Sequence, residues 1–213
     1  MPERIFQAMM AVALGWGWYD IAFLLGAGFL GLLRVHEFRS LTYGYFLTPS
    51  RLLSAAGPMY ITVVKPKMRR LTARRSYTRI DDPTFVLFAE AFAASGRDSQ
   101  LIFQGPYARL RRIFIAICEA VGLAPHDGHG LSWGSLRPGG ATWLYRCTDN
   151  SELVRFRGRW ASARMLETYI QEVGAVSLLP SLHPSLRERI LHLAGLAPGL
   201  LADAALRCRA SPV

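Results

Sequence analysis

Lysine is nearly absent from this chain. Only Lys65 and Lys67 among the 25 basic residues are lysines, and they stand together in K-P-K. Arginine is a permanently charged clamp for phosphates, whereas lysine can also give up a proton. We therefore expect the two lysines to lie where a proton donor is useful, with chance clustering of two residues as the alternative.

Acidic residues are also few. The 213 residues include 15 aspartates and glutamates, which leaves a formal net charge of +10. This excess favours a polyanionic partner, nucleic acid before a membrane surface, although biased base composition in the gene would produce it too. With 51% hydrophobic residues, the chain can form one large domain with a sizeable core, which argues against disorder.

Cysteine and metal-binding patterns are sparse as well. Cys118, Cys147 and Cys208 show no paired spacing and no cleavable signal peptide precedes them, which indicates reduced thiols and an intracellular location. His126 and His129 form an H-x-x-H, but no nearby cysteine or carboxylate set completes a zinc site. The sequence therefore predicts no metal and no small-molecule cofactor.

Long hydrophobic runs are missing too. Residues 5–33 are almost uncharged, but Asp20 interrupts them, and the longest clean run, 21–33, has only 13 residues. A transmembrane helix needs roughly 20. We expect two buried core helices with a break near Gly15–Trp18, where glycines interrupt the pattern. A membrane-associated helical protein is the alternative.

Three short motifs stand out among the residues that are present. G-L-L-R-V-H-E-F contains Arg34 and Glu37, S-L-R-P-G-G-A-T contains Arg137, and G-R-W places Trp160 nine residues before Tyr169. In this order they resemble the two arginine boxes and the closing tyrosine box of the tyrosine recombinase, or phage integrase, family. The residues of S-L-R-P-G-G-A-T and G-R-W most resemble those of recombinase-like proteins from eukaryotic mobile elements.

The resemblance implies DNA strand cleavage and rejoining, as in site-specific recombination or integration, through a 3′-phosphotyrosyl intermediate. It also implies double-stranded DNA as the partner, a homo-oligomer on that DNA, and a nuclear location in a eukaryote. A type IB topoisomerase would share this chemistry. The roles that the resemblance implies are Tyr169 as nucleophile, Arg34 and Arg137 as phosphate clamp, Glu37 as support for Arg34, Trp160 as N–H donor, and Lys67, or alternatively Lys65, as general acid.

One motif position departs from the family. Where relatives usually have a histidine, three residues before Arg137, this chain has Gly134. Glycine can neither accept the tyrosine proton nor bind the phosphate, so His129 becomes the candidate for that role. General acid–base assistance is worth roughly 10²–10⁴-fold in rate. A catalytically decayed DNA-binding relic of a mobile element is therefore the second hypothesis.

The resemblance also suggests how the chain is divided. A catalytic domain would occupy residues 1–175 and a C-terminal helical tail residues 176–213, while the N-terminal core-binding domain of the family is missing. The tail would either dock into a neighbouring subunit or pack on its own core.

The expected fold class is mainly α with a small antiparallel β-sheet (α+β), similar to the catalytic domain of tyrosine recombinases. Residues 43–47, 59–64 and 76–80 are rich in β-branched and aromatic residues, which predicts short strands. The basic segment between the last two would be the tip of a hairpin, and a solvated charged turn is the alternative. Four arginines of that tip would contact the DNA backbone without reading sequence: Arg69, Arg70, Arg74 and Arg75.

Helix signals occupy most of the remaining chain. Asp82 followed by Pro83 is an N-cap with proline in the first turn, and Asn150 is a similar cap. Predicted helices begin near Pro83, Pro106, Arg137, Ser151, Ala161 and Ser185, the fifth carrying Tyr169, and residues 200–206 form a further apolar segment.

Overall fold

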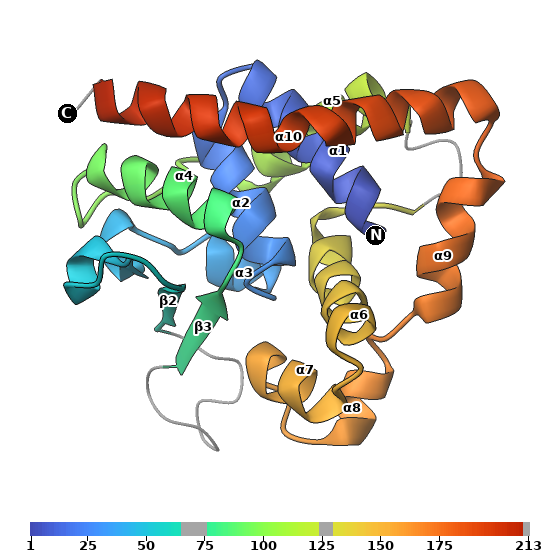
Figure 1. Ribbon diagram of the computed structural model, residues 1–213, viewed down its shortest axis with the longest axis horizontal. Coiled ribbons are helices and arrows are strands. Elements are labelled where there is room, and N and C mark those ends of the chain that lie inside the picture. The colour runs from blue at the N-terminus through green and yellow to red at the C-terminus, as the bar shows by residue number, and fades with distance from the viewer. Residues whose placement is uncertain (65–75, 124–129, 211–213) are drawn as a thin grey trace.

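The computed structural model describes residues 1–64, 76–123 and 130–210, and these residues form mostly helices with one small sheet (Figure 1). The expected fold class, mainly α with a small antiparallel sheet, is confirmed. The α-helices are α1 Glu3–Gly15, α2 Tyr19–Phe29, α3 Val35–Phe38, α4 Pro83–Ala94, α5 Tyr107–Val121, α6 Leu136–Thr148, α7 Ser151–Gly158, α8 Ala163–Glu167, α9 Glu172–Ser181 and α10 Pro184–Ala210. Short 3-10 turns are η1 Tyr43–Tyr45, η2 Ser50–Leu52 and η4 Trp133–Ser135, and the strands are β1 Phe46–Leu47, β2 Met59–Val63 and β3 Ser76–Ile80.

The apolar N-terminal stretch folds as two helices. α1 has 13 residues and α2 has 11, and the chain turns between them at Gly17, whose φ of 72° is in the left-handed region. Glycine adopts this conformation without the steric penalty of other residues. The predicted break near Gly15–Trp18 is confirmed. Neither helix has the length that a membrane span requires.

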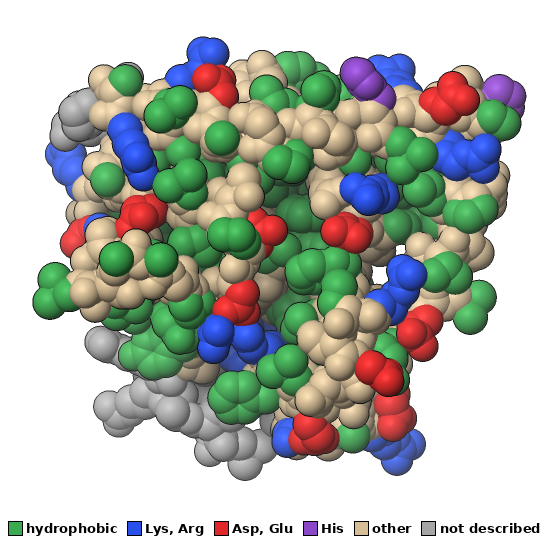
Figure 2. Space-filling view, viewed as in Figure 1, with side chains coloured by type: hydrophobic (Ala, Val, Ile, Leu, Met, Phe, Trp, Pro, Cys, Tyr) green, Lys and Arg blue, Asp and Glu red, His purple; other side chains and the backbone are tan. Residues whose placement is uncertain are grey.

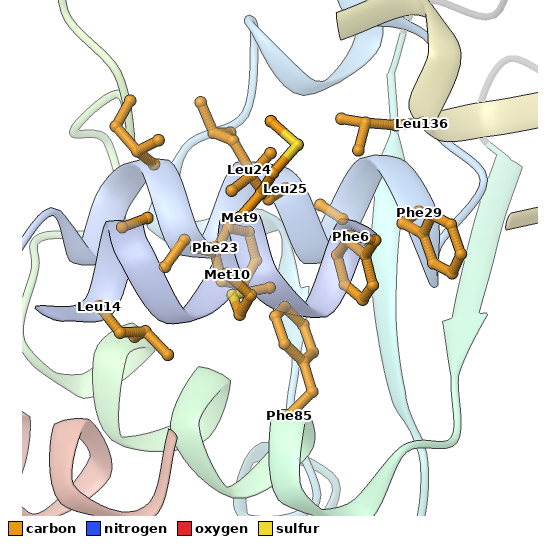
Figure 3. Close-up of a cluster of buried hydrophobic side chains, with 14 of the residues drawn as sticks. Phe6, Met9, Met10, Leu14, Phe23, Leu24, Leu25, Phe29, Phe85 and Leu136 are labelled. Carbon is orange, nitrogen blue, oxygen red and sulfur yellow. The ribbon is translucent and has the colours of Figure 1, made fainter. Parts of the chain in front are cut away.

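The core is built around α2, whose residues from Ile21 to Phe29 are all buried. In the close-up of Figure 3, aromatic side chains of α1, α2 and α4 meet beside two methionines of α1. The rings of Phe23 and Phe85 lie 5.8 Å apart, and those of Phe6 and Phe29 stack at 4.1 Å. Aromatic pairs at these distances stabilise a core beyond the area that they bury.

Local capping signals fix where two helices start. Asp82 accepts a hydrogen bond from the backbone N–H of Phe85 at 2.7 Å, and Asn150 accepts one from Leu153 at 2.9 Å. Each side chain satisfies a donor that a helix start leaves free, which typically contributes about 1 kcal/mol. Both predicted caps are confirmed.

The 27-residue helix α10 is the one described helix that is long and apolar enough to cross a membrane. It lies across α1 and α4 (Figure 1), and one face, including Ile190, Ala194 and Leu201, is buried there. A core helix of a globular protein has the same length and composition, so this is weak evidence for a membrane. Of the two expectations for the tail, the structure shows packing on its own chain. Residues 200–206, expected as a separate segment, continue α10.

The sheet has the order β1-β2-β3 and is antiparallel throughout. β2 and β3 pair from Met59 with Ile80 to Val63 with Ser76, as two arms of a hairpin. The first expected strand is shorter than predicted, because residues 43–45 form η1 and only 46–47 pair. The lysines and arginines of residues 65–75 lie outside the described residues, so the predictions made for them have no structural counterpart.

Candidate active site

A buried carboxylate organises the residues of the first motif. Glu37 lies on α3, and its side chain is 0% exposed. It accepts a hydrogen bond from the backbone N–H of Arg34 at 2.8 Å and one from the Arg34 guanidinium at 3.0 Å. The expected pairing of the two residues is confirmed. Its burial sets it apart from an ordinary surface ion pair.

Two further arginines reach the same carboxylate from distant parts of the chain. A guanidinium nitrogen of Arg159 lies 2.7 Å from Glu37 Oε2, and one of Arg137 lies 3.7 Å from it. Burial alone would raise the pKa of Glu37, but Arg159, Arg34 and Arg137 together hold that pKa below its ordinary value. We call Arg34, Glu37, Arg137 and Arg159 the arginine cluster.

Arg137 is the most enclosed arginine of this cluster, with 4% of its side chain exposed. It is the second residue of α6 and donates to the backbone carbonyls of Leu32 at 2.8 Å and Gly158 at 2.6 Å. Burial, with repulsion from Arg34 and Arg159, lowers the pKa of Arg137 to about 9. The guanidinium therefore stays charged at neutral pH, but in a site that disfavours its charge.

Close packing of α6 on the end of α2 brings Arg137 to this position. A Cβ atom on Gly140 would collide with the backbone carbonyl oxygen of Phe29, and one on Gly139 with that of Met1. Only glycine permits such an approach of two backbones. The glycine pair of S-L-R-P-G-G-A-T is thus explained by close packing.

Trp160 and Tyr169 cover the Arg137 guanidinium. Arg137 Cζ lies 4.5 Å from the centroid of the Trp160 ring and 5.7 Å from that of Tyr169. The two rings are 4.9 Å apart. Trp160 is buried and Tyr169 half-buried. Arg137 and Tyr169 are 32 positions apart in the sequence but lie in one cluster.

Tyr169 is not in a helix, which corrects the prediction of a helix from Ala161 that carries it. α8 ends at Glu167, and Tyr169 lies in the turn that follows. Its backbone N–H donates to Leu166 at 2.7 Å, which tightens the turn and ends the helix. The carbonyl oxygen of Tyr169 makes its contact with α6, where the hydroxyl of Thr142 lies 3.2 Å away.

Thr142 is a site residue that sequence reasoning missed. Its buried hydroxyl lies 3.2 Å from the carbonyl oxygen of Tyr169 and 2.8 Å from that of Pro138, and it accepts from the N–H of Gln171 at 3.1 Å. These contacts attach the Tyr169 turn to the helix that carries Arg137. The sequence feature that could have identified Thr142 is its position as the last residue of S-L-R-P-G-G-A-T, the motif that contains Arg137.

Several buried hydrogen-bond donors in and beside the cluster have no partner among the described residues. They are Nε of Arg137, Nε and one terminal nitrogen of Arg159, and the indole nitrogen of Trp160. By contrast, the indole N–H of the buried Trp133 donates to Leu110 at 2.8 Å. An unpartnered buried donor costs about 1–3 kcal/mol. Three guanidiniums and one carboxylate leave two positive charges in excess, so the site suits an anion.

The remaining predicted positions contribute less. Gly134 is exposed in η4, and a Cβ atom there would contact only Ser132 Oγ, at 3.3 Å. The vacant histidine position therefore has room for a side chain. His129, the candidate replacement, and Lys65 and Lys67, the candidate acids, fall outside the described residues. Within residues 1–64, 76–123 and 130–210, no group of three or more His, Cys, Asp or Glu side chains could hold a metal.

A hollow elsewhere on the surface lacks an excess of positive charge among its described lining residues. Figure 2 shows a hollow with hydrophobic side chains beneath α10, lined by residues of α1, α4 and α10 among others. Its charged lining residues in the described part of the chain are Glu3 and Asp82, and Asp82 caps α4. The arginine cluster with Trp160 and Tyr169 is therefore the candidate active site.

Comparison with known proteins adds no family to this picture. No protein-family model matches the chain, and no curated protein is significantly similar to it.

Proposed function

We propose that this protein cuts and rejoins DNA strands with Tyr169 as the nucleophile. One observation carries the proposal: Arg34, Arg137, Trp160 and Tyr169, chosen from separate motifs, lie in one cluster. With Arg159, the two arginines surround one buried carboxylate and leave an excess of two positive charges. The likeness to a tyrosine recombinase catalytic domain is part of this proposal. A preformed group of donors aimed at one anion is what stabilisation of a phosphoryl transition state requires.

The proposed step is a transesterification without a metal or cofactor. The phenolic oxygen of Tyr169 attacks a DNA phosphodiester, an O–P bond forms, the phenol passes its proton to a base, for which His129 is the candidate, and the bond from phosphorus to the 5′ oxygen breaks. The 5′ oxygen leaves as a hydroxyl after it receives a proton, which we assign to Lys67. Attack by a 5′-hydroxyl on the phosphotyrosine then reverses the step. The covalent intermediate divides one difficult reaction into two easier ones.

The motif residues have separate parts in this step. Arg34 and Arg137 neutralise the non-bridging oxygens as negative charge grows on them. Trp160 donates its indole N–H, which has no partner among the described residues. Its ring packs on Tyr169 and limits the positions that the nucleophile can take.

A nicked suicide substrate tests the proposal. The nick lets the 5′ product strand diffuse away, so the covalent intermediate accumulates and migrates as a shifted band on a denaturing gel. We expect the wild-type protein to form this adduct and Tyr169→Phe to form none. An adduct of equal yield in Tyr169→Phe would exclude Tyr169 as the nucleophile. Relaxation of supercoiled DNA without strand exchange would assign a topoisomerase outcome to the same chemistry.

A DNA-binding relic is the second candidate function, and Gly134 favours it. The position that supplies a histidine in the family carries no side chain here, and the proton of Tyr169 has no assigned acceptor among the described residues. Salt-sensitive DNA binding by the folded protein, with no adduct on any nicked substrate, would select this candidate.

A further inference from the structure

Arg159 occupies a backbone position that normally belongs to glycine. It follows the last residue of α7 with φ 59° and ψ 41°. Its N–H donates to Phe156 at 3.1 Å and the N–H of Trp160 donates to Arg155 at 3.0 Å, the bond pattern of a Schellman cap. A side chain in this left-handed conformation costs roughly 1–2 kcal/mol. An arginine is thus present where glycine would be more stable.

The side chain of Arg159 enters the arginine cluster and is not fully used there. It is 13% exposed and donates to Glu37 at 2.7 Å. Its Nε and one terminal nitrogen are buried without a partner in the described parts of the chain. Burial lowers the pKa of Arg159 despite the contact with Glu37.

By charge count, Glu37 needs only one of the three guanidiniums, although Arg159 makes the shortest contact with it, at 2.7 Å. The carboxylate already accepts the backbone N–H and the guanidinium of Arg34, and Arg137 lies 3.7 Å away. A buried ion pair of this kind adds little net stability, because desolvation offsets the attraction. Arg159 therefore has hydrogen-bond donors without a partner in the described residues and an unfavourable left-handed backbone conformation. It also adds positive charge beyond what Glu37 neutralises. Together these features point to a ligand.

We propose that Arg159 is a third phosphate ligand, in addition to Arg34 and Arg137, and supplies the hydrogen bonds that Gly134 cannot. The proposal rests on the proposed function for the identity of the ligand, a DNA phosphodiester. Arg159 exchanges no proton in the reaction and acts only through charge and hydrogen bonds. Its geometry fits this role, since a guanidinium has several donors in one plane that match phosphate oxygens.

The charge of the cluster indicates at which stage Arg159 contributes most. A phosphodiester has one negative charge, whereas the five-coordinate phosphorus species in the transition state carries two. The two excess positive charges of the cluster match the two negative charges of the transition state. An interaction that is stronger in the transition state raises the rate of the chemical step more than the affinity for DNA.

Inorganic phosphate is a probe that requires no DNA cleavage. Thermal unfolding would be followed at constant ionic strength while phosphate replaces chloride. We expect phosphate to raise the melting temperature of the wild-type protein, because a ligand of the folded state stabilises it. Arg159→Gly suits the backbone of the cap, so it should fold without phosphate and bind phosphate about tenfold or more weakly, the scale of a lost charged hydrogen bond. Arg159→Lys should keep part of the affinity.

Arg157→Gln is the matched control. Arg157 is two residues away and pairs with the half-exposed Asp81 at 2.6 Å, so its loss should leave phosphate binding unchanged. Wild-type phosphate affinity in Arg159→Gly would overturn the inference, as would failure of this variant to fold, which would assign Arg159 a structural role.

The same variants separate the inference from the proposed function. With nicked DNA, Arg159→Gly should lower the adduct rate by a larger factor than it lowers DNA affinity. Phosphate binding that depends on Arg159, with no wild-type adduct, would reject the strand-transfer chemistry and keep the anion site. A Tyr169-dependent adduct whose rate is unaffected by Arg159→Gly would reject Arg159 and keep the chemistry.

Discussion

Glu37 and Asp81 are both carboxylates held between arginines, but they lie in opposite environments. Asp81 pairs with Arg79 and Arg157, each at 2.6 Å, and 47% of its side chain is exposed. Glu37 is 0% exposed and is approached by three arginines that are themselves 4–19% exposed. Water can also solvate Asp81 and Arg79, which are about half exposed, although Arg157 is 16% exposed. The Glu37 carboxylate is out of contact with water, so only other protein groups can compensate its charge.

This difference separates an architectural contact from a binding site. Asp81 links the end of β3 to α7 through Arg157, and exposed pairs of this kind contribute about 0–1 kcal/mol. The arginine cluster gathers more positive charge than its carboxylate neutralises and leaves buried donors without partners in the described chain. Such an arrangement lowers stability unless an anion completes it, and it is already organised when the anion arrives.

Removing the carboxylate from each group should give the largest contrast. Glu37→Gln leaves one buried and two half-buried guanidiniums without a counter-charge, so we expect it to lower the free energy of unfolding by about 3–5 kcal/mol. Asp81→Asn should lower it by less than about 1 kcal/mol. Urea denaturation of both variants, without phosphate in the buffer, measures the two values. Equal losses would show that burial does not distinguish the groups.

The features that were predicted from sequence depend on neighbouring residues. The break before α2 follows from Gly17, and the starts of α4 and α7 follow from Asp82 and Asn150, which act within three residues of their own positions. The pairing of Arg34 with Glu37 was similarly local, one helical turn apart. These contacts join residues three positions apart and need no partner from a distant part of the chain.

The features that were missed depend on contacts between distant segments. Tyr169 lies in the turn after α8, and its backbone contacts Thr142, 27 positions away. Arg159 reaches Glu37 across 122 positions from a left-handed residue that propensity would assign to glycine. Arg159 and Thr142 were both inside recognised motifs, but their partners, Glu37 and the Tyr169 segment, lie on other elements of the fold.

Lowering the pH should remove the stability that the charged Glu37 carboxylate contributes. The folded-state pKa of Glu37 lies below its ordinary value, so the unfolded chain takes up the proton first as pH falls. The stability that the charged carboxylate contributes is full above its ordinary pKa and is lost as pH falls through the folded pKa. The difference in unfolding free energy between wild type and Glu37→Gln should therefore shrink from about pH 6 to about pH 3. A difference that grows over this interval would contradict the direction assigned to Glu37.

The same comparison of a buried with an exposed group can be made for two threonine hydroxyls of α6, those of Thr142 and Thr148. Both Thr142 and Thr148 donate to the carbonyl one turn earlier at 2.8 Å, but Thr148 is exposed and Thr142 also contacts the Tyr169 segment. Thr142→Val keeps the shape and removes those contacts, for which we expect about 1 kcal/mol of stability.

The loss of stability should be accompanied by a slower chemical step. A tyrosine turn that is no longer held against α6 spends less time with its hydroxyl at the phosphate, and small displacements of reacting groups lower rates strongly. We expect about tenfold slower adduct formation in Thr142→Val, on the order of one lost hydrogen bond or more, and no change in Thr148→Val. Because both variants lose the same hydroxyl from the same helix, a rate loss confined to Thr142→Val would assign it to the position of Tyr169. Equal rates in the two variants would mean that Trp160 and Arg137 alone position the nucleophile.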